Sequence, residues 1–225
     1  MYQCKYCKKS FVKEGTLFSH ACEKKRRVMA EHDKPNRLGF NMWLRFHKFC
    51  TPNSKTQKTY EDFIDSNYYT GFLKFARHVI DLNPHNIEDF ADFVIKNSIK
   101  LDDWCKIWVY ESWIREINKK ESTDRAVERC VLLMKTWSQS TNNDWRQFFK
   151  EANTNTAVHW IRTGRISPWV IYATEQGQGL IHRFSDEQIN MVVEYIEPKF
   201  WKFKIARQQE DTTWIQSVFD NAGIT

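Results

Sequence analysis

Hydrophobic positions recur at helical spacing along most of this 225-residue chain. Between residues 37 and 50, for example, Leu38, Met42, Phe46 and Phe49 repeat every three to four positions, which places their side chains on one face of a helix. No segment alternates convincingly between apolar and polar residues, as a half-buried strand would. The pattern therefore predicts an all-α body with helical segments at 37–50, 58–82, 86–97, 102–120, 122–137, 143–151, 155–164, 167–174, 185–196 and 198–220.

The composition agrees with a helical, globular protein. Aromatic residues make up 15% of the chain, whereas Gly and Pro number only seven and five. No apolar run approaches the roughly 18 residues that a bilayer-spanning helix needs. The N-terminus carries cysteines and lysines where a secretion signal would need an apolar stretch, so we expect a cytoplasmic protein that is neither exported nor bound to membranes.

The first 27 residues follow a different pattern, "YQCKYCKKSFVKEGTLFSHACEKKRR" from residue 2 onward. Cys4 and Cys7 are separated by two residues, and twelve residues separate Cys7 from His20. Phe11 and Leu17 stand between them at the positions of a small core. This segment resembles the zinc finger with two cysteines and two histidines at every defined position up to the first histidine. The resemblance implies a ββα module and one structural Zn²⁺, because so short a module needs a metal to fold.

The fourth ligand departs from that family, because only Ala21 separates His20 from Cys22. Residues two apart on a helix point about 200° away from each other, so both cannot reach one ion from a continuous helix. We expect the helix to end near His20 and the chain to turn Cys22 inward, since thiolate is a good zinc ligand. His32 is the alternative. The predicted metal ligands are Cys4, Cys7, His20 and Cys22.

Positive charge is concentrated in this module. The net charge of the chain is +6, and residues 1–27 carry eight Lys or Arg against two Glu, so the remainder is nearly neutral. Such a local excess favours contacts with the phosphates of DNA or RNA. By family resemblance the base-reading positions fall on Lys13, Thr16 and Ser19, which predicts little sequence preference. The predicted nucleic-acid contacts are Lys5, Lys8, Lys9, Lys13, Lys24, Lys25, Arg26 and Arg27.

These features predict three parts: a zinc finger at 1–27, a basic and polar linker at 28–36, and an all-α domain at 37–225. The helical domain is expected to bind a protein partner or to self-associate. Aromatic residues alternate with bases at 72–78 and 200–207, either as core residues beside solvated cations or as stacking platforms for single strands. We expect Cys50, Cys105 and Cys130 to be reduced thiols.

Residues 153–179 predict two short helices joined by a tight turn. Trp160, Gly164, Ile166 and Pro168 resemble small phage repressor motifs of the form W-x-x-x-G-x-I-x-P. The second helix is apolar, so the segment is either a DNA-reading helix-turn-helix or an ordinary buried hairpin. With the H-x-C-E-x-K-R-R ending at 20–27, "GRISPWVIY" at 164–172 makes the whole chain resemble uncharacterised zinc-finger proteins of large tailed bacteriophages. That resemblance implies a viral protein in the host cytoplasm, without implying an activity.

No catalytic pattern stands out. The chain has no Gly-rich phosphate loop, no G-x-S-x-G and no H-E-x-x-H. His47 and Cys50 form at most half of a second metal site. Paired carboxylates occur at 60–66 and 86–92, where they suit helix starts. We therefore expect a non-enzymatic, nucleic-acid-associated accessory protein. The alternatives are a structural or assembly factor whose finger docks on protein, and a nuclease with dispersed carboxylates.

Overall fold

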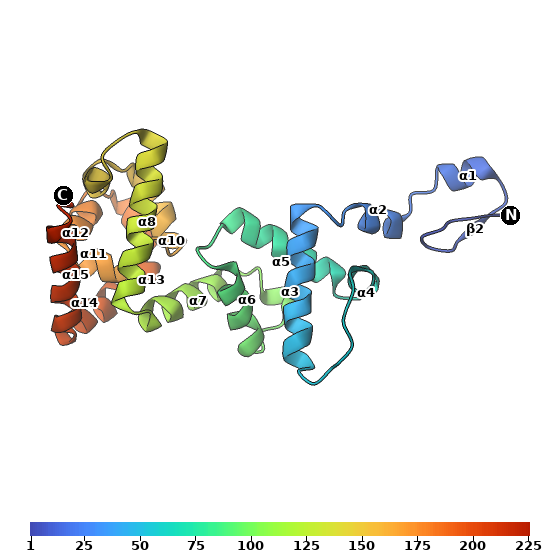
Figure 1. The fold of residues 1–225 in the computed structure, drawn as a ribbon, viewed down its shortest axis with the longest axis horizontal. Helices are drawn as coiled ribbons and strands as arrows, with labels where there is room; N and C mark the ends of the chain where they lie inside the picture. The colour runs from blue at the N-terminus through green and yellow to red at the C-terminus, as the bar shows by residue number, and fades with distance from the viewer. The chain divides into compact units, whose positions relative to one another are not determined.

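The computed structural model describes residues 1–225, and they form two compact units. The first unit comprises residues 1–82 and 87–105, and the second comprises residues 83–86 and 106–225. Apart from a two-stranded sheet near the N-terminus, the regular structure is helical (Figure 1). The predicted fold class, a small ββα module followed by helices, is confirmed. The residues from 37 onward, predicted as one domain, are divided between the two units.

The first unit begins with the module predicted to bind metal. Strand β1 (Tyr2–Gln3) pairs antiparallel with β2 (Ser10–Phe11), and Tyr2 lies opposite Phe11. The helices that follow are α1 (Glu14–Phe18), α2 (Glu23–Met29), α3 (Lys34–Cys50), α4 (Tyr60–Asp65), α5 (Tyr69–Leu82) and α6 (Ile87–Lys96), with a 3-10 turn η1 (Leu101–Asp103).

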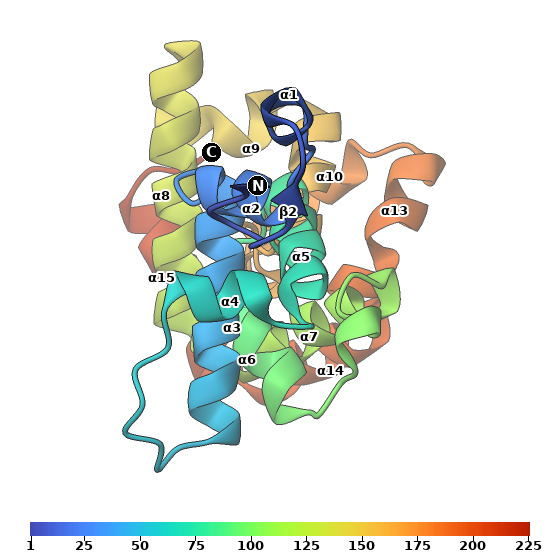
Figure 2. The ribbon, with the colours of Figure 1, turned by 90° about the vertical axis from the view of Figure 1, so that its right-hand side faces the viewer.

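An aromatic core holds these helices together. Helix α3 packs along α5 and contacts α6, as both views of the ribbon show (Figures 1 and 2). Arg45 on α3 forms an ion pair with Asp92 on α6, where its Nη2 lies 2.9 Å from a carboxylate oxygen. The largest buried side chains are Trp43, Phe63, Phe72, Phe75, Phe90 and Trp104.

Three predicted boundaries in this unit are wrong. The segment 58–82 is two helices, because Ser66 adopts an extended conformation and its hydroxyl bonds to the carbonyl of Phe63 at 2.8 Å. The predicted linker 28–36 is largely helical, since its first residues finish α2 and its last begin α3, with Pro35 in the first turn. The segment 102–120 is interrupted where Lys106 is extended, after the buried Trp104.

The second unit is a bundle of helices with its own core. Its elements are α7 (Ile107–Lys120), α8 (Thr123–Thr141), η2 (Trp145–Gln147), α9 (Phe148–Glu151), α10 (Thr154–Arg162), α11 (Pro168–Ala173), α12 (Glu175–His182), α13 (Asp186–Ile196), α14 (Pro198–Arg207) and α15 (Gln209–Asn221). Residues 83–86 belong to this unit, because the ring of His85 stacks on Trp113 at 5.4 Å between centroids. None of the helices in the structure combines the length and apolar character needed to cross a lipid bilayer.

The segment 153–179 folds as a buried hairpin. Gly164 follows α10 with a φ of +74°, and a Cβ there would meet the Nδ1 of His85 at 2.6 Å. The Ser167 hydroxyl then caps α11 by accepting from the backbone N–H of Trp169 at 3.2 Å. Most side chains of α11 are buried, so this helix supports the core instead of presenting a face to DNA. Helix α12 was not predicted, and the single helix predicted at 198–220 is divided at Gln208.

Candidate metal centre

Four potential metal ligands meet at the N-terminal module. The ligand atoms of Cys4, Cys7, His20 and Cys22 all lie within 4.8 Å of one another. A tight turn presents the two first cysteines: the backbone N–H of Lys8 donates to the Cys4 carbonyl at 2.9 Å, and Lys8 has a φ of 61°. His32 is not part of the group. The structure contains no second group of three or more such ligands.

The H-x-C ending is accommodated by a break between two helices. Helix α1 ends at Phe18, and Ser19 forms its C-cap. Cys22 has an extended backbone (φ −87°, ψ 111°) and is the N-cap of α2, where its sulfur accepts from the backbone N–H of Lys25 at 3.4 Å. Because neither His20 nor Cys22 lies inside a helix, both side chains can turn to the same point.

The distances fit four-coordinate geometry. The Sγ atoms of Cys4 and Cys22 are 3.8 Å apart, and the Sγ of Cys7 lies 3.3 Å from the Nε2 of His20. With metal–sulfur and metal–nitrogen bonds of about 2.3 and 2.05 Å, the edges of a tetrahedron would be about 3.8 Å and 3.6 Å. These two distances are close to the edges of a tetrahedron, and all four ligand atoms lie within 4.8 Å of one another, so the group could hold one metal ion.

The thiols differ in acidity. Hydrogen bonds from the backbone N–H groups of Cys7 and Tyr6 lower the pKa of Cys4 to about 7. The backbone of Lys9 lowers the pKa of Cys7, but desolvation and the thiols of Cys22 and Cys4 outweigh it and raise that pKa overall. A metal binds the thiolate form, so the lowered pKa of Cys4 favours coordination near neutral pH.

The module has almost no hydrophobic core of its own. Among residues 1–22, only Cys4 and Cys22 are buried, while Phe11 and Leu17 are half-buried. Phe11 contacts the ring of His20 at 4.9 Å between centroids. So little apolar burial cannot offset the entropy lost on folding, which is the situation in which a bound metal supplies the folding free energy.

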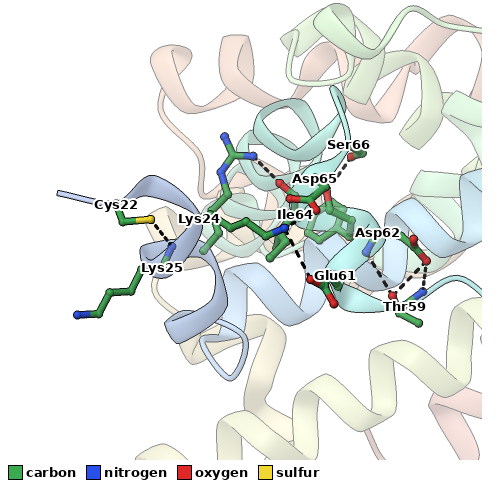
Figure 3. Close-up of polar contacts among 11 residues, drawn as sticks. Cys22, Lys24, Lys25, Thr59, Glu61, Asp62, Ile64, Asp65 and Ser66 are labelled. Atoms are coloured by element: carbon green, nitrogen blue, oxygen red, sulfur yellow. Dashed lines mark hydrogen bonds and ion pairs between the residues drawn. The ribbon is translucent and has the colours of Figure 1, made fainter. Parts of the chain in front are cut away.

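Helix α2 joins the metal ligands to the helices of the first unit. The Nζ of Lys24 lies 2.6 Å from an Asp65 carboxylate oxygen and 3.6 Å from one of Glu61, as Figure 3 shows. Arg27 donates to the Ile64 carbonyl at 2.6 Å, and its guanidinium lies 4.2 Å from the centre of the Tyr69 ring. Two of the four basic residues at 24–27 therefore hold α2 against α4 and α5.

The other predicted contact residues remain exposed to solvent. Neither the four lysines of the ββα module nor the two outward-facing cations of α2 form an ion pair with a carboxylate. We call this set the outer cations: Lys5, Lys8, Lys9, Lys13, Lys25 and Arg26. Of the predicted base-reading positions, Lys13 and Thr16 are exposed, whereas the Ser19 hydroxyl is bonded to the carbonyl of Gly15 at 3.0 Å.

Two exposed apolar side chains of this module were not predicted from the sequence. Phe18 is 93% exposed at the end of α1, and Val12 is 83% exposed beside β2. The zinc-finger pattern assigns its core positions to Phe11 and Leu17, so it gives no role to these two residues. Val12 directly follows Phe11, and Phe18 directly follows Leu17, so two adjacent apolar residues at each place could have indicated that one of them is exposed.

The carboxylates at 60–66 and 86–92, and His47, interact with other side chains of the first unit. Asp62 forms a capping box with Thr59 at the start of α4 (Figure 3). Glu61 and Asp65 interact with Lys24, and Asp92 with Arg45. The His47 ring packs edge-on against Trp43 at 4.4 Å. Cys50, Cys105 and Cys130 are free thiols, and burial raises the pKa of Cys130 to about 12.

No family model, curated protein or solved structure matches this chain.

Proposed function

We propose that this chain is a nucleic-acid-associated accessory protein whose N-terminal module, folded around one structural Zn²⁺, binds phosphates with little sequence preference. The observation that carries this proposal is the set of six outer cations around the four-ligand cluster, none of them neutralised by a carboxylate of the chain. Cations without a carboxylate partner on one small module can neutralise successive phosphates, which is the main source of non-specific affinity.

Zinc is the metal that the donor set favours. Three thiolates and one imidazole form a soft set with tetrahedral spacing, which suits Zn²⁺ better than the oxygen-preferring Mg²⁺ or Ca²⁺. All four positions are supplied by Cys4, Cys7, His20 and Cys22, so a structural role fits better than a catalytic one, which needs an open position. The ion would fold the module and fix the start of α2.

The limited reading surface supports non-specific contact. Helix α1 has only five residues, and the Ser19 hydroxyl is bonded to its own backbone. Lys13 is the single long polar side chain at the base-reading positions. A helix this short offers few contacts to base edges, so phosphates would contribute most of the binding free energy.

The test is equilibrium binding of the full-length, zinc-loaded chain to labelled DNA and RNA duplexes of unrelated sequence at low salt. A Lys5→Gln, Lys9→Gln, Lys13→Gln variant should bind all of them more weakly while keeping its metal content. The matched control is Lys48→Gln, Lys55→Gln, Lys74→Gln, which removes three exposed lysines from α3, the loop after it and α5. Absence of wild-type binding to either nucleic acid at low salt would reject the proposal.

Docking of the module on another protein is the second candidate function. Phe18 and Val12, at 93% and 83% exposure, would offer an apolar contact that phosphate binding does not need. Burying these side chains at an interface would remove apolar surface from water and so favour association. A Phe18→Ser variant that binds nucleic acid like the wild type but loses a co-purifying protein would favour this alternative.

A further inference from the structure

The outer face of helix α14 carries aromatic rings and positive charges together. At about 100° per residue, its exposed arc contains three cations and two phenylalanines, and α14 contains no acidic residue. Phe203 is 58% exposed and Phe200 is 37% exposed. We call this arc the α14 face, and its members are Lys199, Phe200, Lys202, Phe203 and Arg207.

The opposite side of the same helix is committed to the core. Trp201 is fully buried, and Lys204 lies over the rings of Trp169 and Trp201 at 4.5 and 4.8 Å. Lys204 also donates to the carbonyl of Lys119 at 2.8 Å. The aromatic and basic residues at 200–207 therefore lie on two different sides of α14, one facing the core and one facing solvent. The inner residues pack against the core. Among the outer ones, Phe200 contacts the Nζ of Lys119 at 4.6 Å from its ring centre and the edge of Trp201, so Phe203 is the more accessible of the two rings.

The charges of the α14 face are not neutralised within the unit. Lys199, Lys202 and Arg207 form no ion pair with a carboxylate. The nearest acids have other partners: Glu197 pairs with Lys119 at 2.7 Å, and Asp211 accepts from Gln208 at 3.2 Å. Glu210 is exposed in the first turn of α15, so the positive character is strongest toward the start of α14.

From this arrangement we infer that the α14 face binds single-stranded nucleic acid, with unpaired bases stacked on Phe203 and Phe200 and phosphates held by Lys199, Lys202 and Arg207. The choice of ligand rests on the proposed function, but the site is separate from the metal centre. Half-exposed rings beside cations are the combination that single-strand binding uses, because any base can stack on them. The guanidinium of Arg207, 4.5 Å from the Phe203 ring centre, extends the stacking surface.

A duplex or a membrane surface fits the α14 face less well. The bases of a duplex are already stacked on each other, so they would leave both rings without a partner. Binding in a membrane interface needs a broad apolar helix face, and only two partly exposed rings stand on this one. The three cations alone could bind the phosphates of a duplex or of a membrane. The two exposed rings favour a ligand with unpaired bases.

The experiment compares binding of the full-length chain to oligothymidine of about 12 nucleotides, a length within the usual site size, and to a duplex of equal length. Phe200→Ala with Phe203→Ala should weaken oligothymidine binding at least about five-fold and leave duplex binding unchanged. Phe49→Ala, which removes a ring of 52% exposure from α3, is the matched control. Circular dichroism should show the same helix content in every variant.

Charge variants and vesicles complete the test. Lys199→Ala with Lys202→Ala should weaken oligothymidine binding, whereas Lys135→Ala with Lys150→Ala, two exposed lysines elsewhere in the second unit, should not. Unchanged oligothymidine binding in the double phenylalanine variant would overturn the inference, as would α14 variants that lose only binding to vesicles containing phosphatidylserine. Because the Lys5, Lys9 and Lys13 variant leaves α14 intact, failure of the N-terminal site and failure of this one can be distinguished.

Discussion

The sulfur of Cys22 accepts a hydrogen bond from the backbone N–H of Lys25 at 3.4 Å, so the last predicted metal ligand is also the N-cap of helix α2. The same helix is held against α4 and α5 through Lys24 and Arg27. A metal ion bound by the four ligands would therefore fix the start of α2. The other contacts of α2 are with α4 and α5 in the first unit. The connection is direct because Cys22 is itself the N-cap, so no residue separates this ligand from α2.

Loss of the Cys22 thiol should release the metal. Cys22→Ala removes one of four ligands and exposes the ion to water, so we expect much weaker zinc retention through dialysis, measured by metal analysis of the purified chain. Cys50→Ala removes an exposed thiol outside the cluster and should retain one zinc per chain. Full retention by Cys22→Ala would show that His32 or water can complete the site.

Arg27 and its neighbour Arg26 should behave differently on substitution to alanine. Arg27→Ala removes a hydrogen bond to Ile64 and the contact with the Tyr69 ring, which together stabilise the docking of α2 by about 1–2 kcal/mol. Arg26 is exposed, so Arg26→Ala should change stability by less than about 0.5 kcal/mol.

Amide hydrogen exchange measures this difference locally. Peptides from 60–82 should exchange faster in Arg27→Ala than in the wild type, and at the wild-type rate in Arg26→Ala. Equal exchange in the two variants would mean that α2 does not depend on the Arg27 contacts.

The sequence predicted which ligands would meet, because their types and spacing up to His20 match a known module, and geometry then required a turn before Cys22. It did not predict α2, because "EKKRRVM" has no apolar stripe and its helix depends on the Cys22 cap and on charges of α4. Similarly, hydrophobic spacing continues through Ser66 and Gln208, whereas the helix ends there depend on side-chain and backbone bonds that spacing does not record.

His85 should make the second unit less stable in mild acid. Burial and the nearby positive charge of Arg129 lower its pKa to about 4, from an ordinary value near 6.5. Between these two values the unfolded chain binds a proton that the folded chain excludes, so stability is full above about pH 6.5 and falls as the pH drops toward 4. The free energy of unfolding lost through His85 is at most about 3.4 kcal/mol.

Hydrogen exchange in α7 and α10, the helices beside His85, should report that loss. Exchange protection in wild type should fall between pH 6.5 and 4 after correction for the intrinsic rate, and the fall should be smaller in His85→Gln. An identical pH dependence in the two proteins would show that His85 does not control it.

Salt dependence should reveal which cations contact phosphates. If all six outer cations contact a duplex, the slope of log K against log salt should be about −5, since each contact contributes about −0.9. Lys25→Ala with Arg26→Ala should flatten the slope by about 2 and should do so equally on unrelated sequences. The control, Lys48→Ala with Lys55→Ala, removes the same charge at a distance in sequence from the cluster and should leave the slope unchanged. A slope that both pairs change equally would mean that net charge, not the face around the metal centre, determines binding.

Substituting Lys24 and Arg27 instead should act mainly through the lost docking of α2, because those side chains already interact with carboxylates and with a backbone carbonyl.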